Sequence, residues 1–146
     1  ADATRLLVAR RLPGGQFALV VFDADGRRLQ TLAFDGQFVD AAFASGNHGV
    51  GVVRRAGLFS ELLVVAADTL RQQQVVFRGR ARFSDVAWSP NGRWLLLGWA
   101  GADQWLFIRS TDVSKVKAVE SLAAHFDPGG TGTGEFPRID GWCCPG

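Results

Sequence analysis

The sequence predicts an all-β protein built from repeated antiparallel units of about four strands each. Short apolar segments of strand length alternate with turn dipeptides such as Asp25-Gly26 and Asn91-Gly92, which favour tight hairpins. FVDAAFASGNHGVGVV also aligns under FSDVAWSPNGRWLLLG, matching Phe38 with Phe83 and Asp40 with Asp85 at a spacing of 45 residues (83 − 38 = 45). That period is typical of units of four strands that pack against their neighbours.

The clearest unit starts at Phe83, and its first strand, 83–88, alternates in the manner of a half-buried strand. Pro90 cannot donate to a strand ladder, so the first strand ends before the Asn91-Gly92 turn. Residues 94–99 are apolar on both faces, which is typical of a strand between two neighbouring sheets.

The rest of this unit is read from turns and alternation. A turn over 100–103 leads to a third strand over 104–109, and Gly98 and Gly101 argue against one helix over 94–108. A fourth strand is expected over 115–119 because the unit needs one. Val116, Val119, Leu122, Ala123 and Phe126 also fall at helical spacing behind a possible Asp112 cap, so a helix is the alternative there.

The first unit, 5–34, contains three apolar segments and lacks a first strand. The expected strands are 6–9, 17–22 and 28–34, and the turns between them contain Pro13-Gly14-Gly15 and Asp25-Gly26. The segment therefore resembles the last three strands of a four-stranded unit.

The second unit, 38–78, is a degraded copy. Ser45-Gly46-Asn47 stands in the place of Pro90-Asn91-Gly92. Gly51 leaves a gap in the apolar strand that corresponds to 94–99. Its third and fourth strands are expected over 61–67 and 73–77.

The glycine-rich stretch 127–134 is expected to be a flexible connector, and 136–146 a possible closing strand. The segment near 139–143 would pair with the incomplete first unit. A closed ring of such units typically contains four to eight of them, so three units are too few to close a ring. Association of several chains, a longer parent protein, or closure as a small barrel all remain open.

The turn SPNG and the strands around it carry a family resemblance. SPNGRWLLLGW followed by QWLFIRSTD resembles the repeat of WD40-like β-propellers of the TolB and tricorn type, which centre on Ser-Pro-Asp-Gly. Ser89, Pro90 and Gly92 match that pattern, and Asn91 stands where the family usually has Asp. The resemblance implies propeller blades over 5–34, 38–78 and 83–120, in an incomplete ring, and a location outside the cytoplasm.

Length and charge bound the possibilities. The 146 residues suit a single domain over 1–146, and a net charge of +2 gives no strong field for nucleic acid or an anionic membrane. No apolar run is long enough to span a bilayer.

Two groups of charged residues are candidate binding sites. Arg78, Arg80 and Arg82 would share one face of a strand, where they could hold a phosphate or carboxylate group. The alternative is a solvated loop between blades. Asp40 and Asp85 recur at matching repeat positions, where they could bind a cation in a central channel or accept backbone N–H bonds at a blade corner.

Cys143 and Cys144 are the only thiols and form a vicinal pair. A disulfide, to another chain or within the pair, competes with ordinary buried or terminal cysteines, and a metal site would need further ligands. No catalytic or cofactor motif is recognisable, so we expect no enzyme activity, cofactor or metal.

These features together predict a non-catalytic binding or scaffolding module that contacts a protein partner on a blade edge or loop face, or that self-associates as a homo-oligomer. The resemblance implies an alternative, the non-catalytic propeller of a larger secreted hydrolase or peptidase. Recognition of an anionic ligand by the arginine cluster is a third reading.

Overall fold

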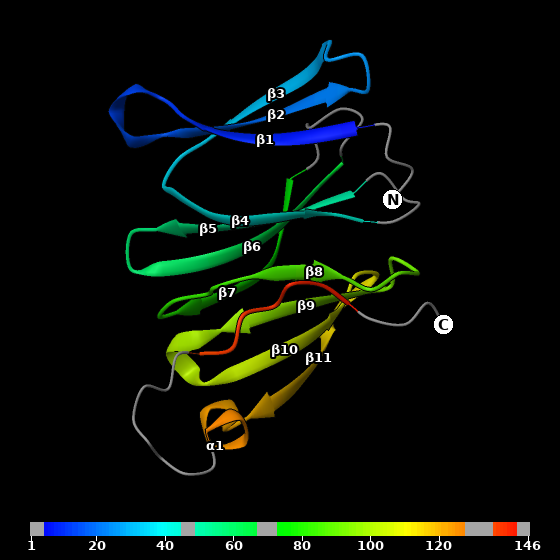
Figure 1. Ribbon diagram of the computed structural model, residues 1–146. Coiled ribbons are helices and arrows are strands. Elements are labelled where there is room, and N and C mark those ends of the chain that lie inside the picture. The colour runs from blue at the N-terminus through cyan, green and yellow to red at the C-terminus, as the bar shows by residue number, and fades with distance from the viewer. Residues whose placement is uncertain (1–4, 45–48, 67–72, 128–135, 143–146) are drawn as a thin grey trace.

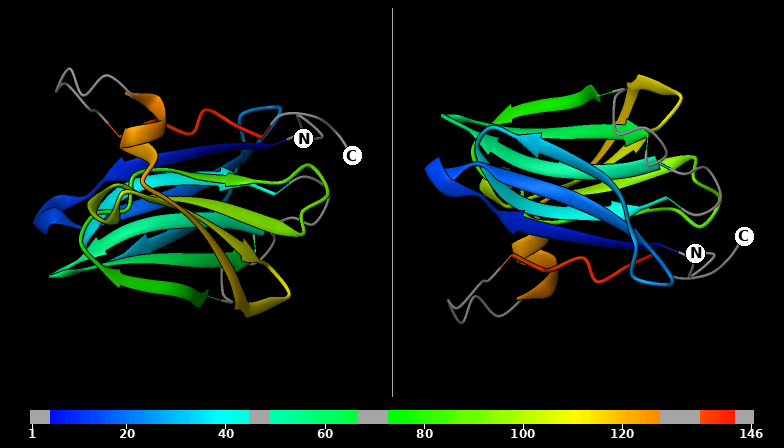
Figure 2. Two further views of the ribbon diagram at one scale, coloured as in Figure 1. Left: turned by 90° about the horizontal axis from the view of Figure 1, so that it is seen from below. Right: turned by 90° about the horizontal axis from the view of Figure 1, so that it is seen from above.

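Three antiparallel β-sheets stack one on another, as the sequence predicts (Figure 1). The computed structural model describes residues 5–44, 49–66, 73–127 and 136–142. Figure 2 views the stack from its two ends. The fold is all-β and propeller-type, with successive sheets in the order of the three predicted repeat units.

Each sheet is a meander of neighbouring strands. Sheet A consists of β1 (Arg5–Arg11), β2 (Phe17–Asp23) and β3 (Arg28–Phe34). Sheet B consists of β4 (Gln37–Phe43), β5 (Gly49–Ala56), β6 (Phe59–Ala66) and β7 (Gln73–Arg80). Sheet C consists of β8 (Val86–Trp88), β9 (Trp94–Trp99), β10 (Gln104–Arg109) and β11 (Asp112–Glu120). The helical segments are η1 (Pro13–Gly15), η2 (Ala100–Ala102) and α1 (Leu122–Phe126).

The SPNG turn is built by its serine. The backbone N–H of Gly92 donates to the Ser89 carbonyl at 2.9 Å, and the N–H of Trp94 donates to Ser89 Oγ at 2.9 Å. Gly92 has a φ of 66°, a value that favours glycine. The turn therefore fixes where β8 ends and β9 begins.

One hydrophobic core lies between sheets B and C. It includes Val53 and Leu62 from sheet B and Leu95, Leu97 and Ile108 from sheet C, all fully or almost fully buried. The gap that the sequence indicates at Gly51 is filled by sheet C. A Cβ atom at Gly51 would lie 3.1 Å from Leu95 Cδ2 and 3.1 Å from Trp88 Nε1.

A second core lies between sheets A and B. Phe17, Leu19 and Val21 on β2 pack against Val50 and Val52 on β5. Each sheet therefore buries alternate side chains against its neighbour, as stacked sheets do.

The third unit differs from the sequence prediction at both of its ends. β8 is shorter than the predicted strand 83–88, because the backbones of Ser84 and Asp85 both bond to Gly98: the Ser84 N–H donates to the Gly98 carbonyl, and the Gly98 N–H donates to the Asp85 carbonyl, outside the regular ladder. The predicted fourth strand forms and is longer than expected, since it covers 112–120. The helical alternative is found only over 122–126.

The described part of the predicted closing strand does not form a strand. Residues 136–142 belong to no sheet and lie on sheet C, where the Trp142 ring meets Phe107 edge to face at 5.7 Å. Figure 1 shows this segment running beside β8 and β9. Its aromatic residues pack on the last sheet, which favours that position over pairing with sheet A. Among the described residues, no helix is long and apolar enough to cross a membrane.

Candidate binding surface

Sheet A ends at β1, at the position where sheets B and C each have one further strand. In sheet B the first strand, β4, pairs with one side of β5, and in sheet C the first strand, β8, pairs with the same side of β9. We call this side of each sheet its inner edge, and the first strand the inner strand. β1 pairs with β2 on one side, and no strand of the described residues pairs with its other side. Within the part of the chain that the structure describes, the unit predicted to lack its first strand therefore has an open inner edge.

The hydrogen-bonding direction of β1 follows from its turn. The N–H of Leu12 donates to the Gln16 carbonyl at 2.8 Å, so Arg10 and Val8 direct their backbone groups toward β2 by the alternation of an antiparallel pair. Leu7 and Ala9 alternate with Val8 and Arg10 along β1, so their N–H and C=O groups point toward the open edge. Such groups can accept an added strand.

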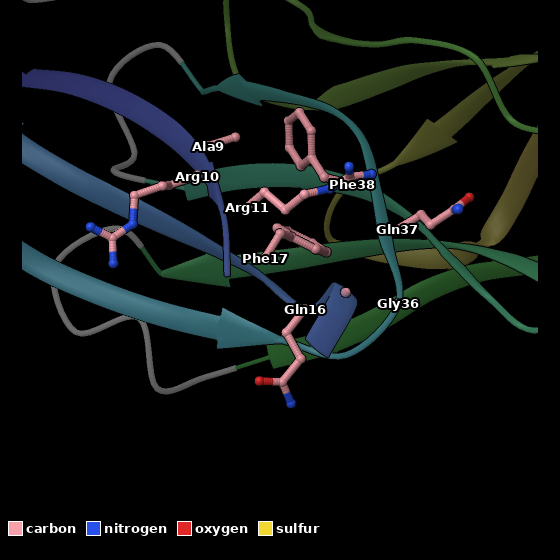
Figure 3. A pocket seen from close by; sticks show the side chains of 9 residues that line it. Ala9, Arg10, Arg11, Gln16, Phe17, Gly36, Gln37 and Phe38 are labelled. Atoms are coloured by element: carbon pink, nitrogen blue, oxygen red, sulfur yellow. The ribbon is translucent and has the colours of Figure 1, made fainter. Parts of the chain in front are cut away.

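A groove runs along this edge between β1 and β4, mainly apolar in its first compartment and mixed in its second. It has two adjoining compartments of about 320 Å³ and 390 Å³ that share Ala9 and Phe38. The first is lined by Arg5, Leu6, Leu7, Ala9, Leu19, Phe38, Ala41 and Phe43. The second adds Arg10, Arg11, Gly15, Gln16, Phe17, Gly36 and Gln37 (Figure 3).

Aromatic rings fix the wall of the second compartment. The Phe17 ring stacks on Phe34 at 5.0 Å and meets Phe38 edge to face at 5.2 Å. The Arg11 side chain lies in this compartment with Phe17 and Phe38 (Figure 3). Neither Arg10 nor Arg11 forms an ion pair with another described residue, so the groove carries positive charge next to a rigid apolar wall.

The structure brings the two repeated aspartates close together at the inner ends of sheets B and C. The Asp40 carboxylate accepts the N–H of Val86 at 2.9 Å, and Asp85 Oδ1 lies 4.0 Å from Arg138 Nε. Burial raises the pKa of the Asp40 carboxyl, and the nearby Asp85 charge acts in the same direction. Hydrogen bonds from the Val86 and Ala41 N–H groups and the charge of Arg138 oppose that rise. Asp40 thus accepts a backbone N–H, which is one of its two expected roles, and its role as a ligand-binding residue stays a prediction.

Unlike the Asp40 carboxylate, the Asp85 carboxylate accepts no hydrogen bond from a backbone N–H among the described residues. Its Oδ2 atom is buried without a hydrogen bond, as are Ser84 Oγ and Trp105 Nε1, all three in or next to sheet C. Residues 136–142 and α1 cover this sheet: Phe136 approaches Gly98, and the Phe126 ring meets Trp105 at 5.6 Å. Sheet C is therefore covered by other described residues of the chain, whereas none of the described strands pairs with the outer side of β1 in sheet A.

The arginine cluster divides in two. Arg78 and Arg80 lie on β7 and both place their guanidinium groups over the Phe59 ring, at 4.0 and 5.8 Å from its centre. Arg78 also pairs with the buried Glu61 at 3.4 Å, and Glu61 is held more tightly by Arg54 at 2.8 Å. Arg82 lies beyond the end of β7, after Ala81 with its positive φ of 72°, so it does not continue that strand face.

Cys143 and Cys144 lie outside the described residues. Within the described part of the chain, no group of three or more His, Cys, Asp or Glu side chains could hold a metal ion. Sequence reasoning missed the groove as a site, although its signal was present: the first unit lacked a strand whose position in the other units was known.

Comparisons with known proteins place the chain by its fold. No family model matches the sequence, and no curated protein matches it. Among solved structures, hydrazine synthase of Kuenenia stuttgartiensis is similar at 12% identity with a TM-score of 0.57, over 74% of this chain and 37% of that one. A chain of the nidogen–laminin complex is similar at 11% identity and a TM-score of 0.56, over 78% and 43%.

The β-propeller domain of Cps50 (Swd1) from Myceliophteria thermophila is similar at 16% identity and a TM-score of 0.50, over 82% of this chain and 42% of that one. The fold is propeller-type. This chain spans less than half the length of each of these three structures. Membership of the TolB type in particular stays a prediction from the SPNG turn.

Proposed function

We propose that this chain is a non-catalytic binding module that takes an extended segment of a protein partner as the missing strand of sheet A. The observation that carries this proposal is the open inner edge of β1 next to an apolar groove. Addition of a strand to a sheet edge is a common way for proteins to bind peptides, because main-chain hydrogen bonds supply affinity and pockets supply specificity.

The energetics of such binding follow from the edge and the groove together. Each new main-chain hydrogen bond contributes about 0.5–1.5 kcal/mol net. Side chains of the added strand that enter the groove gain about 25 cal/mol per Å² of apolar surface buried. The Phe17, Phe34 and Phe38 rings already hold one another in place, so little ordering of the wall opposes binding.

Strand β4 supplies a probe, because it is this chain's own inner strand. A labelled peptide with the sequence of residues 37–43, QFVDAAF, is titrated with the protein, and its fluorescence anisotropy is measured. We expect saturable binding. In the Ala9→Pro variant, the N–H group that faces the open edge is lost while the bonds from β1 to β2 remain, so binding falls at least about tenfold.

Thr31→Pro is the matched control. Thr31 lies on β3, the opposite edge strand of the same sheet, and alternation directs its N–H away from β2. Proline there tests the general effect of an edge substitution without touching the groove. Wild-type affinity in Thr31→Pro and weakened affinity in Ala9→Pro support the proposal. Absence of any binding to the wild type, or equal binding to both variants, contradicts it.

Association of copies is a second candidate, favoured by the outer face of sheet A. Leu29 and Val8 are exposed on this face, and Leu6, which also lines the groove, is 60% exposed. Large exposed apolar side chains grouped on one sheet face are typical of protein contact surfaces. Analytical ultracentrifugation of the wild type and of Leu29→Glu, at a residue that lines neither compartment of the groove, tests this candidate: a dimer or larger species that the substitution dissociates supports it, and a monomeric wild type contradicts it.

The other two readings have less support. The anionic-ligand reading requires free arginines, and Arg78 is already paired with Glu61. The reading as part of a larger hydrolase stays a prediction from the resemblance.

A further inference from the structure

We infer that the segment which completes sheet A runs antiparallel to β1 and carries an acidic side chain opposite Arg11. This inference rests on the proposed function and adds the direction and the chemistry of the partner. It follows from the face of β1 on which Arg11 lies, and from the pairing that β4 already makes in sheet B.

The side chain of Arg11 lies on the groove side of β1. Side chains alternate along a strand, so Leu7, Ala9 and Arg11 share one face. Leu7 packs against the core between sheets A and B, so this face is directed toward sheet B. Figure 3 shows the Arg11 side chain running toward Phe38, whereas that of Arg10 points away from it.

The charge of Arg11 has no partner among the described residues. Arg11 is exposed, and it lines the second compartment, where none of the lining residues is acidic. Asp35 lies in the adjoining hollow, where it accepts a hydrogen bond from Gln16 Nε2 at 2.7 Å. The groove therefore offers a guanidinium group, next to an aromatic wall, to an acidic side chain of the partner.

The register of sheet B indicates which residue of an added strand lies opposite Arg11. Arg11 directly precedes Leu12, whose N–H closes the turn after β1. Arg55 likewise directly precedes Ala56, which closes the turn after β5. Gln37, the first residue of β4, pairs with Arg55 in the antiparallel ladder. The first residue of an added strand that runs as β4 does would therefore pair with Arg11.

Cross-strand pairing determines which side chain is favoured at that position. Residues directly opposite each other in an antiparallel pair direct their side chains to the same face, so the side chain opposite Arg11 also points into the groove. Opposite charges in such a pair are stabilising, and like charges are destabilising. An aspartate or glutamate is therefore favoured opposite Arg11, and a lysine or arginine is disfavoured.

The test uses the 37–43 peptide, acetylated at its N-terminus, in its natural form and with Gln37→Glu or Gln37→Lys. Fluorescence anisotropy measures the affinity of the protein for each form. We expect the glutamate form to bind about three- to tenfold more tightly than the lysine form. The difference should shrink between about 0.05 and 0.5 M salt, because salt screens the two charges.

Substitutions of Arg11 in the protein provide a second readout. Arg11→Gln should abolish the preference for the glutamate form, and Arg11→Glu should reverse it. Arg10→Glu is the matched control, because it makes the same change of charge on the neighbouring residue, whose side chain points away from Phe38 (Figure 3). This control should keep the preference for the glutamate form.

Equal affinity of the wild type for the glutamate and lysine forms overturns this inference, while the proposed function stands because the peptides still bind. A preference that the Arg11 variants leave unchanged, or that Arg10→Glu changes equally, overturns it as well. Failure of every form of the peptide to bind overturns both proposals.

Discussion

The Asp40 carboxylate on β4 accepts the backbone N–H of Val86 on β8 at 2.9 Å, and the Trp88 indole N–H donates to the Ala42 carbonyl at 3.1 Å in the same region. Both contacts join neighbouring sheets through their inner strands. Stacked sheets are otherwise held by non-directional apolar packing, so these polar contacts set the register of one sheet on the next.

Replacement of Asp40 tests the value of this contact. We expect Asp40→Ala to lower the free energy of unfolding by about 1–3 kcal/mol, because the partly buried Val86 N–H then lacks an acceptor. Asp40→Asn keeps an oxygen acceptor and should retain most of the stability. Urea denaturation of the three proteins measures both effects, and equal stability of the alanine variant and the wild type would show that the contact contributes nothing.

The pH dependence of Asp40 follows from the direction of its pKa shift. Burial raises the pKa of this carboxyl in the folded protein, so the folded state binds a proton more readily than the unfolded state. The resulting stability is present below the ordinary pKa of aspartate and is lost as the pH rises through the raised value. We expect the wild type to lose stability relative to Asp40→Asn as the pH rises from about 3 to 7. A difference that stays constant across this range would contradict the shift.

Gly51 allows sheet C to pack closely on β5. Any side chain there meets Leu95 and Trp88 at 3.1 Å, so we expect Gly51→Val to destabilise the protein by about 1–3 kcal/mol through overpacking. The control is Leu58→Ala at an exposed turn residue, which should change stability by less than about 0.5 kcal/mol. Thermal unfolding followed by circular dichroism compares the two. A Gly51→Val protein as stable as the wild type would show that the sheets can separate without cost.

Glu61 connects three strands of sheet B. Its buried carboxylate lies directly opposite Arg54 on β5 and Arg78 on β7 in the strand register, and it pairs with both. We expect Glu61→Ala to cost about 3–5 kcal/mol, because it leaves the mostly buried Arg54 without its partner. Arg78→Ala should cost less than about 1 kcal/mol, because Arg78 is largely exposed. The reverse order of the two effects in urea denaturation would contradict this assignment.

The sequence predicts the strands and their grouping well, because turn chemistry and a period of two are local properties. Asn91-Gly92 and Asp25-Gly26 lie at the turns that they predict, and the three described sheets follow the three repeat units. The fourth strand of sheet C was open to a helical reading, since Val116 and Val119 fit both periods. The segment forms a strand because it pairs with β10, and no local sequence pattern indicates that pairing.

The position of residues 136–142 could not be predicted from the spacing of the repeats. The segment resembles a first strand, yet Phe136 and Trp142 pack on sheet C, where aromatic contacts with Phe107 are available. The groove was missed for a related reason. A site formed by an unfilled strand position has no motif of its own, and only the missing first strand of unit 5–34 indicated it.

Amide hydrogen exchange at Leu7 and Ala9 tests the open edge of β1 most directly. We expect these two amides to exchange rapidly in the free protein and those of Val8 and Arg10, which face β2, to be protected. Addition of the 37–43 peptide should then protect Leu7 and Ala9. Protection of these two amides in the free protein, or no change when the peptide is added in excess, would contradict the claim that β1 accepts a further strand.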